Sequence, residues 1–532
     1  MKKVIVLLVL LALSFNVVNA ANTLRVGNPR FSWYTYQGTI EEATLSIKPK
    51  GIYYQYDLYL TFSARGTSYT SNDSLEVVFN FDLPENSIIN DSWLWLNDST
   101  IIKARIMDKW SATAIYEGIV ARRQDPSLLT KTSNTHYELR VFPMAGGTTR
   151  KVKISYLVAA DWNKKNVSAK LPTELLTTSL NTVPKLSVIT WPGAEWQNPQ
   201  IVGYPTFNFN QQYTNAQFGN YRYTEITSSY YNSSLSFSYN SPMVNGVYLN
   251  KYQDLSENYY QMVLLPSEII TNVPKKKVVF LVDYDETKTN VTKTNLLNEL
   301  KNKLINQLSV SDSFNLMYSN FVIKKASLNW IPGDSISIEN AFATLTNQLA
   351  DYSNLSPLIG EGISFIGSHG NSGKIMLLSD ADQYGSSSVA NNLVNDIVGS
   401  MNPDIPFYIA DFQNLNYSNN YINGRYYYGN EYFYSNLSTI TQGSYFRTFN
   451  YYYYGTSSNN YTVSDVINLN FDELSGIISA FNLYTSMTGG YCHSRYNLNA
   501  QSNTAYLNKP ILQTGKYIGT FPFSVIVSGD YN

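Results

Sequence analysis

The sequence predicts a multidomain protein in which an antiparallel β-sandwich carrying one helix precedes an α/β domain with a doubly wound parallel sheet. β-rich segments are expected between and after these two domains. Three observations predict this class. The chain has 532 residues, which is too long for one ordinary core. Up to about residue 172 apolar residues recur with period two, and from residue 274 strand patterns alternate with amphipathic helices.

The N-terminus has the organisation of a secretory signal peptide. Lys2 and Lys3 precede the apolar run 4–15, and small residues at 18–20 form a cleavage site after Ala20. The run is too short to span a bilayer stably, although a retained anchor is the alternative. No other apolar run approaches ~20 residues, so we expect an extracellular or cell-surface protein with no transmembrane segment after cleavage of residues 1–20.

The composition argues against several classes of protein. Charged residues make up 14% of the chain and the net charge is −1, whereas nucleic-acid binders carry a basic face, so we expect no nucleic-acid partner. Cys492 is the only cysteine, so no intrachain disulfide can form. The fold must therefore depend on its hydrophobic cores.

Residues 21–172 are expected to form the β-sandwich domain. Segments such as "GIYYQYDLYLTFSA" and "HYELRVFPM" alternate apolar and polar residues, as half-buried antiparallel strands do. One helix is expected at 108–125, where Ala112, Ile115 and Ile119 share one face.

This part of the chain resembles a known family. The segments "LEVVFNFDLPENS", "KARIMDKWSATAIYE", "ARRQDPSLL" and "YELRVFPMAGGTTRKVKISY" are similar, in this order, to the vault protein inter-alpha-trypsin (VIT) domain. The resemblance covers roughly residues 21–158. It implies a β-rich interaction module with no catalytic residues of its own.

Residues 173–272 are expected to be a β-rich linker region packed onto one or both neighbours. "LSVITWPG", "SLSFSYN" and "YYQMVLLP" have strand patterns, and Asn- and Tyr-rich connections separate them.

Residues 273–481 are expected to form the α/β domain. Strands are predicted at 276–283, 313–320, 373–380 and 406–412, and helices at 291–308, 337–350, 357–367, 388–401 and 464–481. Such sheets bind ligands at the carboxyl ends of their strands. Tyr-rich loop insertions are expected at 414–430 and 450–462, where the rings either contact a glycan or protein or pack on one another. Residues 482–532 are expected to form a C-terminal β segment.

Oxygen-bearing side chains gather where two predicted strands end. Asp283 and Asp380 each follow an apolar run, Asp285 and Thr287 come just after Asp283, and Ser353 precedes a predicted helix. Because the carboxyl ends of parallel strands meet at one edge, these side chains predict a site for a hard cation such as Mg²⁺ or Ca²⁺.

The order "VVFLVD-x-D-x-T" followed by "IMLLSD" resembles a degenerate von Willebrand factor type A (vWA) domain. That family holds a metal-ion-dependent adhesion site with an Asp-x-Ser-x-Ser motif, a distant Thr and a distant Asp. Asp283 and Asp380 match, Thr287 keeps the hydroxyl of the last Ser, and Ser353 replaces the Thr. Asp285 stands where the family has Ser. The alternative is a site that has lost its metal, with Asp285 capping the following helix.

Nothing in the sequence supports catalysis. "GSHGNSGKI" lacks the spacing and position of a phosphate-binding loop, the three His have no metal-ligand spacing, and there is no Gly-x-Ser-x-Gly elbow. We expect no catalytic residues and no bound organic cofactor.

The VIT-then-vWA order resembles the heavy chains of inter-alpha-trypsin inhibitor. It implies an exported, non-enzymatic adhesion or scaffold protein that binds an extracellular protein or glycan through the strand tips of its α/β domain. The alternative is a glycan- or matrix-binding structural protein that uses its Tyr-rich loops and has a vestigial metal site. An extracellular hydrolase would need an acid/base pair that the sequence does not show.

Overall fold

The computed structural model describes residues 22–531 except 32–33, 98, 106, 108–110, 114–115, 118–126, 218, 255–256, 271–274, 402–404, 417, 449–460 and 499–503. The expected signal peptide, most of the expected helix at 108–125 and most of the Tyr-rich segment at 450–462 lie outside the described residues. The chain forms two compact units. The first runs to Pro242 without Asn163–Lys165, and the second holds Asn163–Lys165 and Met243–Asn532.

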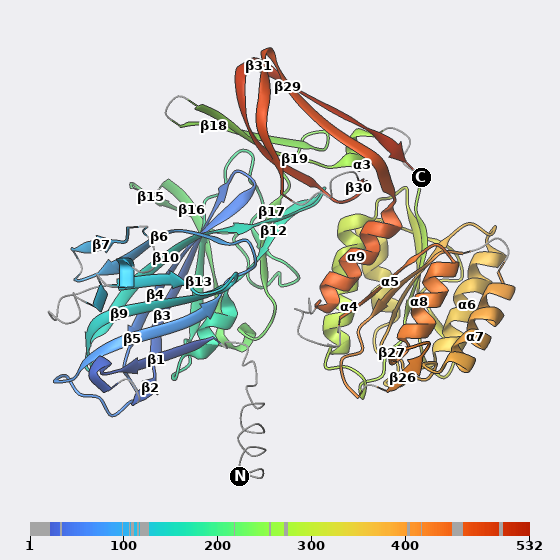
Figure 1. The fold of residues 1–532 in the computed structure, drawn as a ribbon, viewed down its shortest axis with the longest axis horizontal. Coiled ribbons are helices and arrows are strands. Elements are labelled where there is room, and N and C mark those ends of the chain that lie inside the picture. The colour runs from blue at the N-terminus through green and yellow to red at the C-terminus, as the bar shows by residue number, and fades with distance from the viewer. Residues whose placement is uncertain are drawn as a thin grey trace, which may run out of the picture. The chain divides into compact units, whose positions relative to one another are not determined.

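Three sheets build the first unit (Figure 1). The five-stranded sheet contains, in spatial order, β2 (Thr35–Gln37), β1 (Thr23–Gly27), β5 (Ser74–Asp82), β9 (His136–Ala145) and β8 (Ser127–Lys131). The eight-stranded sheet contains β15 (Gln212–Asn215), β16 (Gly219–Thr227), β13 (Lys185–Thr190), β3 (Thr39–Lys50), β4 (Tyr53–Ser63), β10 (Thr149–Ala159), β6 (Ile88–Trp95) and β7 (Ile101–Lys103). The four-stranded sheet contains β11 (Asp161–Trp162), β12 (Asn166–Lys170), β17 (Ser236–Asn240) and β14 (Gln200–Ile201). Short 3₁₀ turns occur at η1 (Pro29–Phe31), η2 (Thr173–Thr178) and η3 (Ser228–Tyr230).

Period-two patterning explains the core of this unit. In β4 every second residue from Tyr54 to Phe62 is fully buried, because successive side chains of a strand point to opposite faces. Phe62 meets Phe79 of β5 at 5.7 Å between ring centroids, and Tyr54 meets Phe237 of β17 at 5.8 Å. The eight-stranded sheet therefore contributes to cores with both other sheets.

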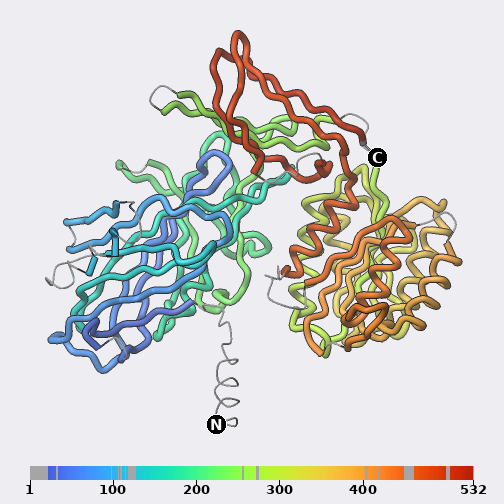
Figure 2. Tube along the Cα trace, viewed as in Figure 1, coloured from blue at the N-terminus to red at the C-terminus, as the bar shows by residue number. Residues whose placement is uncertain are grey.

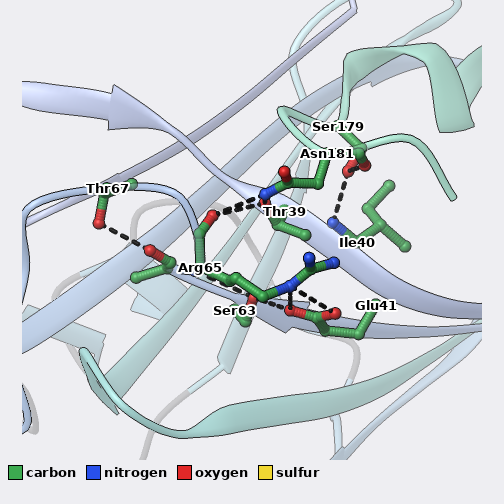
Figure 3. A network of polar contacts seen from close by, with 9 residues as sticks. Thr39, Ile40, Glu41, Ser63, Arg65, Thr67, Ser179 and Asn181 are labelled. Carbon is green, nitrogen blue, oxygen red and sulfur yellow. Dashed lines mark hydrogen bonds and ion pairs between the residues drawn. The ribbon is translucent and has the colours of Figure 1, made fainter.

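The segment expected to be a linker contributes strands to this unit. β13 pairs in parallel with β3 and extends the eight-stranded sheet. Just before β13, Asn181 donates to Thr39 Oγ1 at 2.9 Å, and Ser179 Oγ accepts from the backbone N–H of Ile40 at 2.8 Å (Figure 3). The expected domain boundary at residue 172 therefore falls inside the first unit.

Figure 3 also shows how a bulge in β3 is held. The register between β3 and β4 shifts between Ile40 and Glu42, which leaves Glu41 as the extra residue. Its carboxylate accepts from Arg65 Nε at 2.8 and 3.1 Å and from the Ser63 hydroxyl. Side-chain bonds thus replace the ladder bonds that the bulge interrupts.

The second unit contains the α/β domain, in which a mostly parallel sheet has helices on both faces (Figure 2). The sheet contains, in order, β22 (Lys324–Lys325), β21 (Ser313–Tyr318), β20 (Lys277–Val282), β24 (Lys374–Ser379), β25 (Phe407–Asp411) and β28 (Ser444–Arg447), and β23 (Ile331–Pro332) pairs with β21. The helices are α4 (Lys293–Gln307), α5 (Ser335–Thr344), α6 (Leu355–Ser368), α7 (Ser387–Gly399), α8 (Glu431–Ile440) and α9 (Val463–Ser475).

Two cores cover the two faces of this sheet. Val278 and Phe280 of β20 pack with α4, α5 and α9, whereas Val279 and Leu281 pack with α6, α7 and α8. All residues of β20 after the first are fully buried, as a strand covered on both faces requires. The predicted alternation of strands and helices is confirmed for the described residues.

The end of the α/β domain differs from the prediction. The helix expected at 464–481 ends at Ser475, because Gly476 adopts a φ of +112° and the chain then enters a strand. The Tyr-rich segment 414–430 contains a hairpin of β26 (Asn419–Ile422) and β27 (Arg425–Tyr428). Helix α8 and strand β28 were not predicted from the sequence.

A further β module belongs to the second unit. Its sheet contains, in order, β18 (Val247–Asp254), β19 (Glu257–Leu264), β31 (Ile511–Tyr531), β29 (Ile477–Asn497) and β30 (Thr504–Tyr506), and α3 (Pro266–Ile269) follows β19. The pairing of β29 with β31 is irregular between Met487 and Tyr491. Figure 1 shows that the two-stranded ribbon of β29 and β31 is bent. The ribbon folds back over β19, so that the rings of Tyr260 and Phe523 lie 5.0 Å apart.

Among the described residues, no helix is long and apolar enough to cross a membrane.

Candidate functional site

Three acidic residues lie at the carboxyl edge of the parallel sheet. Asp283 directly follows β20, Asp380 directly follows β24, and Asp411 is the last residue of β25. These strands are parallel neighbours, so the three residues share one edge. All three side chains are fully buried. Burial of this much acid at one edge is costly unless hydrogen bonds or a cation compensate for the lost hydration.

Asp283 is well supplied with hydrogen-bond donors. Its Oδ2 accepts from Ser353 Oγ at 2.6 Å and from Ser379 Oγ at 3.0 Å, and its Oδ1 accepts from the backbone N–H of Asn354 at 2.9 Å. Burial raises the pKa of Asp283, and these hydrogen bonds oppose the increase. The structure therefore brings Ser353, from the loop before α6, onto the carboxylate at the end of β20.

Asp380 has fewer partners than Asp283. Its Oδ1 accepts from the backbone N–H of Asp285 at 2.9 Å, while its buried Oδ2 has no hydrogen-bond partner among the described residues. Burial raises the pKa of Asp380 to about 9, and the nearby charges of Asp283 and Asp285 add to the increase. This oxygen is thus a buried polar atom without a partner among the described residues, close to two further acidic residues.

Asp285 and Thr287 form a local turn in the loop after β20. Asp285 Oδ1 accepts from the Thr287 backbone N–H at 3.0 Å and from its Oγ1 at 2.6 Å. The alternative role for Asp285, capping the next helix, is wrong. Helix α4 begins only at Lys293, and its cap is Thr292, whose side chain accepts from the Asn295 backbone N–H at 3.2 Å.

The loop after Asp380 contacts both the loop after β20 and the loop before α6. Asp382 Oδ2 lies 2.6 Å from Lys288 Nζ, and Gln383 Nε2 donates to Ser353 Oγ at 2.9 Å. The Lys288 ammonium, the cation nearest in sequence to Asp285, is therefore already paired with a carboxylate.

Some residues of this network were missed by sequence reasoning. Tyr434 of α8 donates its hydroxyl to Ser379 Oγ at 2.7 Å, and Ser379 in turn donates to Asp283. Asp411 Oδ2 accepts from the Tyr445 hydroxyl at 2.9 Å. Asp411 could have been predicted from the sequence, because "FYIAD" is an apolar run that ends in Asp, as at the other two strands. No sequence pattern predicts the role of Tyr434, since that role depends on how α8 packs.

The Tyr-rich hairpin is joined to helix α8 by an ion cluster in which Glu431 and Arg447 are buried and Arg425 is exposed. Glu431, the first residue of α8, accepts from Arg425 Nη2 of the hairpin at 2.8 Å and from the buried Arg447 Nη1 at 2.9 Å. The hairpin exposes 65% of Tyr421 and 48% of Tyr426, whose rings lie 4.9 Å apart. The two exposed tyrosines therefore lie on a hairpin that ion pairs fix to helix α8.

The loop leading to this hairpin is bonded to the candidate site. Asn416 Nδ2 donates to the Thr287 carbonyl at 2.7 Å, and the Leu415 backbone N–H donates to the Lys288 carbonyl at 2.9 Å. The loop after β20 and the loop after β25 are thus held together at the same edge.

The donor set fits a hard cation only if hydroxyls take part. Among the described residues, no three His, Cys, Asp or Glu side chains are placed to hold a metal together. A site here would need the Thr287 or Ser353 oxygen beside two of the three carboxylates of Asp283, Asp285 and Asp380. The unsatisfied Oδ2 of Asp380 is the observation that favours a cation, because a metal would supply the missing partner.

The chain resembles known proteins both in the sequence of one segment and in the fold of solved structures. Residues 55–156 match the family model of the vault protein inter-alpha-trypsin (VIT) domain, inside the range 21–158 where the sequence resembles that family. No curated protein matches the chain.

Similar solved structures are distant in sequence. A von Willebrand factor type A protein from Catenulispora acidiphila is 9% identical with a TM-score of 0.28, over 54% of this chain and 69% of that chain. The BatB protein from Bacteroides thetaiotaomicron is 11% identical with a TM-score of 0.26, over 37% and 96%. An M1 zinc metallopeptidase from Deinococcus radiodurans is 9% identical with a TM-score of 0.21, over 58% and 64%.

Proposed function

We propose that the protein is an exported, non-enzymatic adhesion or scaffold protein that binds a macromolecular partner through the carboxyl edge of its α/β domain. The observation that carries the proposal is the buried, unsatisfied Oδ2 of Asp380 beside Asp283 and Asp285. Because its pKa is raised to about 9, Asp380 keeps its proton at neutral pH, and a positive group that binds there would displace the proton and stabilise the ionised carboxylate. The VIT match supports an interaction module in the same chain.

The positive group we propose is a divalent cation. Asp283 and Asp380 would hold it together with Ser353, Thr287 and Asp285, and the bound ion would offer a positive charge to an acidic group of the partner. Because Asp285 replaces the hydroxyl residue of related sites, the donor set is rich in carboxylates. That composition favours Ca²⁺, which takes more oxygen ligands than Mg²⁺.

Calorimetric titration of the purified chain with Mg²⁺ and with Ca²⁺ tests the cation. We expect saturable uptake by the wild type and none by Asp380→Asn. Asp396→Asn is the matched control, because Asp396 is an exposed acid on α7. Wild-type protein without saturable uptake of either ion would end the metal-dependent form of the proposal. A hydrolytic activity lost in Asp283→Asn would contradict its non-enzymatic part.

The hairpin supports a second candidate function, binding of a glycan or matrix polymer. Tyrosine rings offer an apolar face and a hydroxyl, which suits sugar contact, and Glu431 holds the hairpin that presents them. In this case a chelator leaves binding to a glycan array intact, whereas Tyr→Ser at 426–428 removes it. Tyr252→Ser, at an exposed tyrosine of β18, serves as the control.

A further inference from the structure

The β module of the second unit has an unpaired strand edge. β31 pairs with β19 only from Ile511 to Tyr517. Beyond Tyr517 its sole strand partner among the described residues is β29, on the other side. The backbone groups along the free side from 518 to 530 therefore have no ladder partner within the described part of the chain. Such an edge is a template for one more strand.

The core beneath this edge is also incompletely covered. Phe523, Val525 and Val527 of β31 pack against the core of the module but stay half-exposed. Two residues of β18 in the facing layer, Val247 and Leu249, are half-exposed in the same way. β18 reaches this stretch of β31, because Lys251 Nζ lies 4.0 Å from the ring centroid of Phe521. An added strand would complete the cover over both layers.

The edge is protected by Pro522 at the irregularity between Thr520 and Phe523, but the run 523–529 beyond it has no such protection. No charged residue occurs from 517 to 529, and the run 523–527, "FSVIV", is rich in residues that favour strands. Natural edge strands of this length usually place a charge where a second strand would pair. The lack of such a charge indicates an edge that pairs.

We propose that this edge binds the same edge of a second copy of the chain, antiparallel across a twofold axis. Inward-facing residues must lie opposite inward-facing residues, which restricts the register. With Val525 on the axis, Phe523 lies opposite Val527 of the copy, and outward-facing Ser524 lies opposite Ile526.

This register also brings no like charges together. Because the strands are antiparallel, the two Asp530 residues lie at opposite ends of the paired run 523–527 and do not face one another. The half-exposed apolar residues of the two copies become neighbours in one continuous sheet. One self-complementary patch used twice is the usual way in which identical chains form a closed dimer.

Sedimentation equilibrium of the full chain tests the dimer and its register. The wild type should sediment as a dimer. Ser524→Lys combined with Ile526→Lys should give a monomer, because lysines then face lysines twice across the axis. Both residues are exposed, so the fold should tolerate the changes, which circular dichroism checks. Ser524→Glu combined with Ile526→Lys should restore the dimer, since opposite charges then meet.

Two controls and two outcomes decide the proposal. Tyr484→Lys adds one positive charge on β29, at an outward-facing residue that is 49% exposed, and should leave the dimer intact. Ser524→Lys alone should weaken the dimer less than the double substitution. A wild type that is monomeric at every concentration overturns the proposal. A dimer that persists in the double lysine variant also overturns it, because that dimer would use another surface.

Discussion

Ser379 joins the candidate site to helix α8 through two hydrogen bonds. Its hydroxyl donates to Asp283 and accepts from Tyr434, and all three side chains are fully buried. Ser379→Ala leaves a buried tyrosine hydroxyl without this acceptor and removes one donor from a buried carboxylate. We expect a loss of about 1–3 kcal/mol in the free energy of unfolding, measured by urea denaturation.

The double variant Ser379→Ala with Tyr434→Phe separates this network from simple loss of packing. Removing both partners should cost less than the sum of the two single losses, because no hydroxyl is then left unpaired. Strictly additive losses would contradict a coupled network.

Glu41 gives the first unit a pH-dependent contribution to stability. The hydrogen bond from Arg65 is the main cause of its lowered pKa. A carboxyl with a folded pKa below its unfolded pKa, about 4.3, stabilises the fold above that pH, and the contribution is lost as the pH falls through the folded pKa. Arg65→Gln should therefore reduce stability at neutral pH and have no effect in strong acid.

Urea denaturation at a series of pH values checks this prediction. Arg30→Gln, which removes an exposed arginine of η1, should leave the curve unchanged. A stability difference between Arg65→Gln and wild type that is the same in acid and at neutral pH would contradict the assigned role of Glu41.

Residues of the candidate site were identified from apolar runs that end in an acid and from the resemblance that pointed to Ser353, whose hydroxyl donates to Asp283 in the structure. Asp283 and Asp380 were found because an apolar run stops at each, and the structure places both at one sheet edge. The use of Asp285 to bind Thr287 could not be predicted, since a carboxylate after a strand can bind a metal, cap a helix or form a turn.

At the scale of elements, β28 approaches β25 at a glycine. A Cβ at Gly443 would lie 1.8 Å from the Phe407 carbonyl oxygen. Gly443→Ala must push the strand away and should cost about 1–3 kcal/mol in unfolding free energy. Gly399→Ala is the matched control, because no atom lies within 4 Å of a Cβ there and alanine favours the end of helix α7 by up to about 1 kcal/mol. Equal effects of the two changes in thermal unfolding would contradict the close approach.

The ion cluster at Glu431 should be essential for the order of the Tyr-rich hairpin. Glu431→Gln removes the negative charge shared by Arg425 and the buried Arg447, and breaking a buried pair typically costs about 3–5 kcal/mol. Amide hydrogen exchange should show faster exchange in β26 and β27, whereas Glu286→Gln, at an exposed acid, should not. Unchanged protection of the hairpin would show that other contacts hold it.

Most elements were predictable because their burial follows a simple period. α4 was predicted from Leu296, Leu300 and Leu304, and all three are fully buried. α8 was missed because its buried residues include Tyr434 and Ser438 within a Tyr- and Ser-rich segment, where composition hides the apolar face. Only the start of β29 was missed, because the residues around Gly476 continue the helical pattern of α9 up to 481, whereas the rest of β29 lies in the segment 482–532 that was expected to be β.

At the scale of the whole molecule, two compact units predict two unfolding events. If the cation binds as proposed, Ca²⁺ should raise the midpoint of one thermal transition and leave the other unchanged, because only the folded second unit contains the site. Scanning calorimetry with and without Ca²⁺ measures this, and Asp380→Asn should abolish the shift. A shift of both transitions by the same amount would contradict a site confined to one unit.

Domain organisation was only partly predictable for a physical reason. The segment 173–242 has the same Tyr- and Asn-rich turns as a linker, and its strands are short. Its place in the eight-stranded sheet depends on the parallel pairing of β13 with β3, between residues more than a hundred positions apart. Local patterns contain no information about such a pairing.

The pairing of β29 with β31 has a mechanical consequence. The start of β29 and the end of β31 lie side by side, since Ser479 pairs with Asp530 and Asn482 with Ser528. Tension applied between Gly476 and the end of β31 would load one backbone pair at a time, beginning at that end. The strands would then peel apart stepwise at low force instead of resisting in shear.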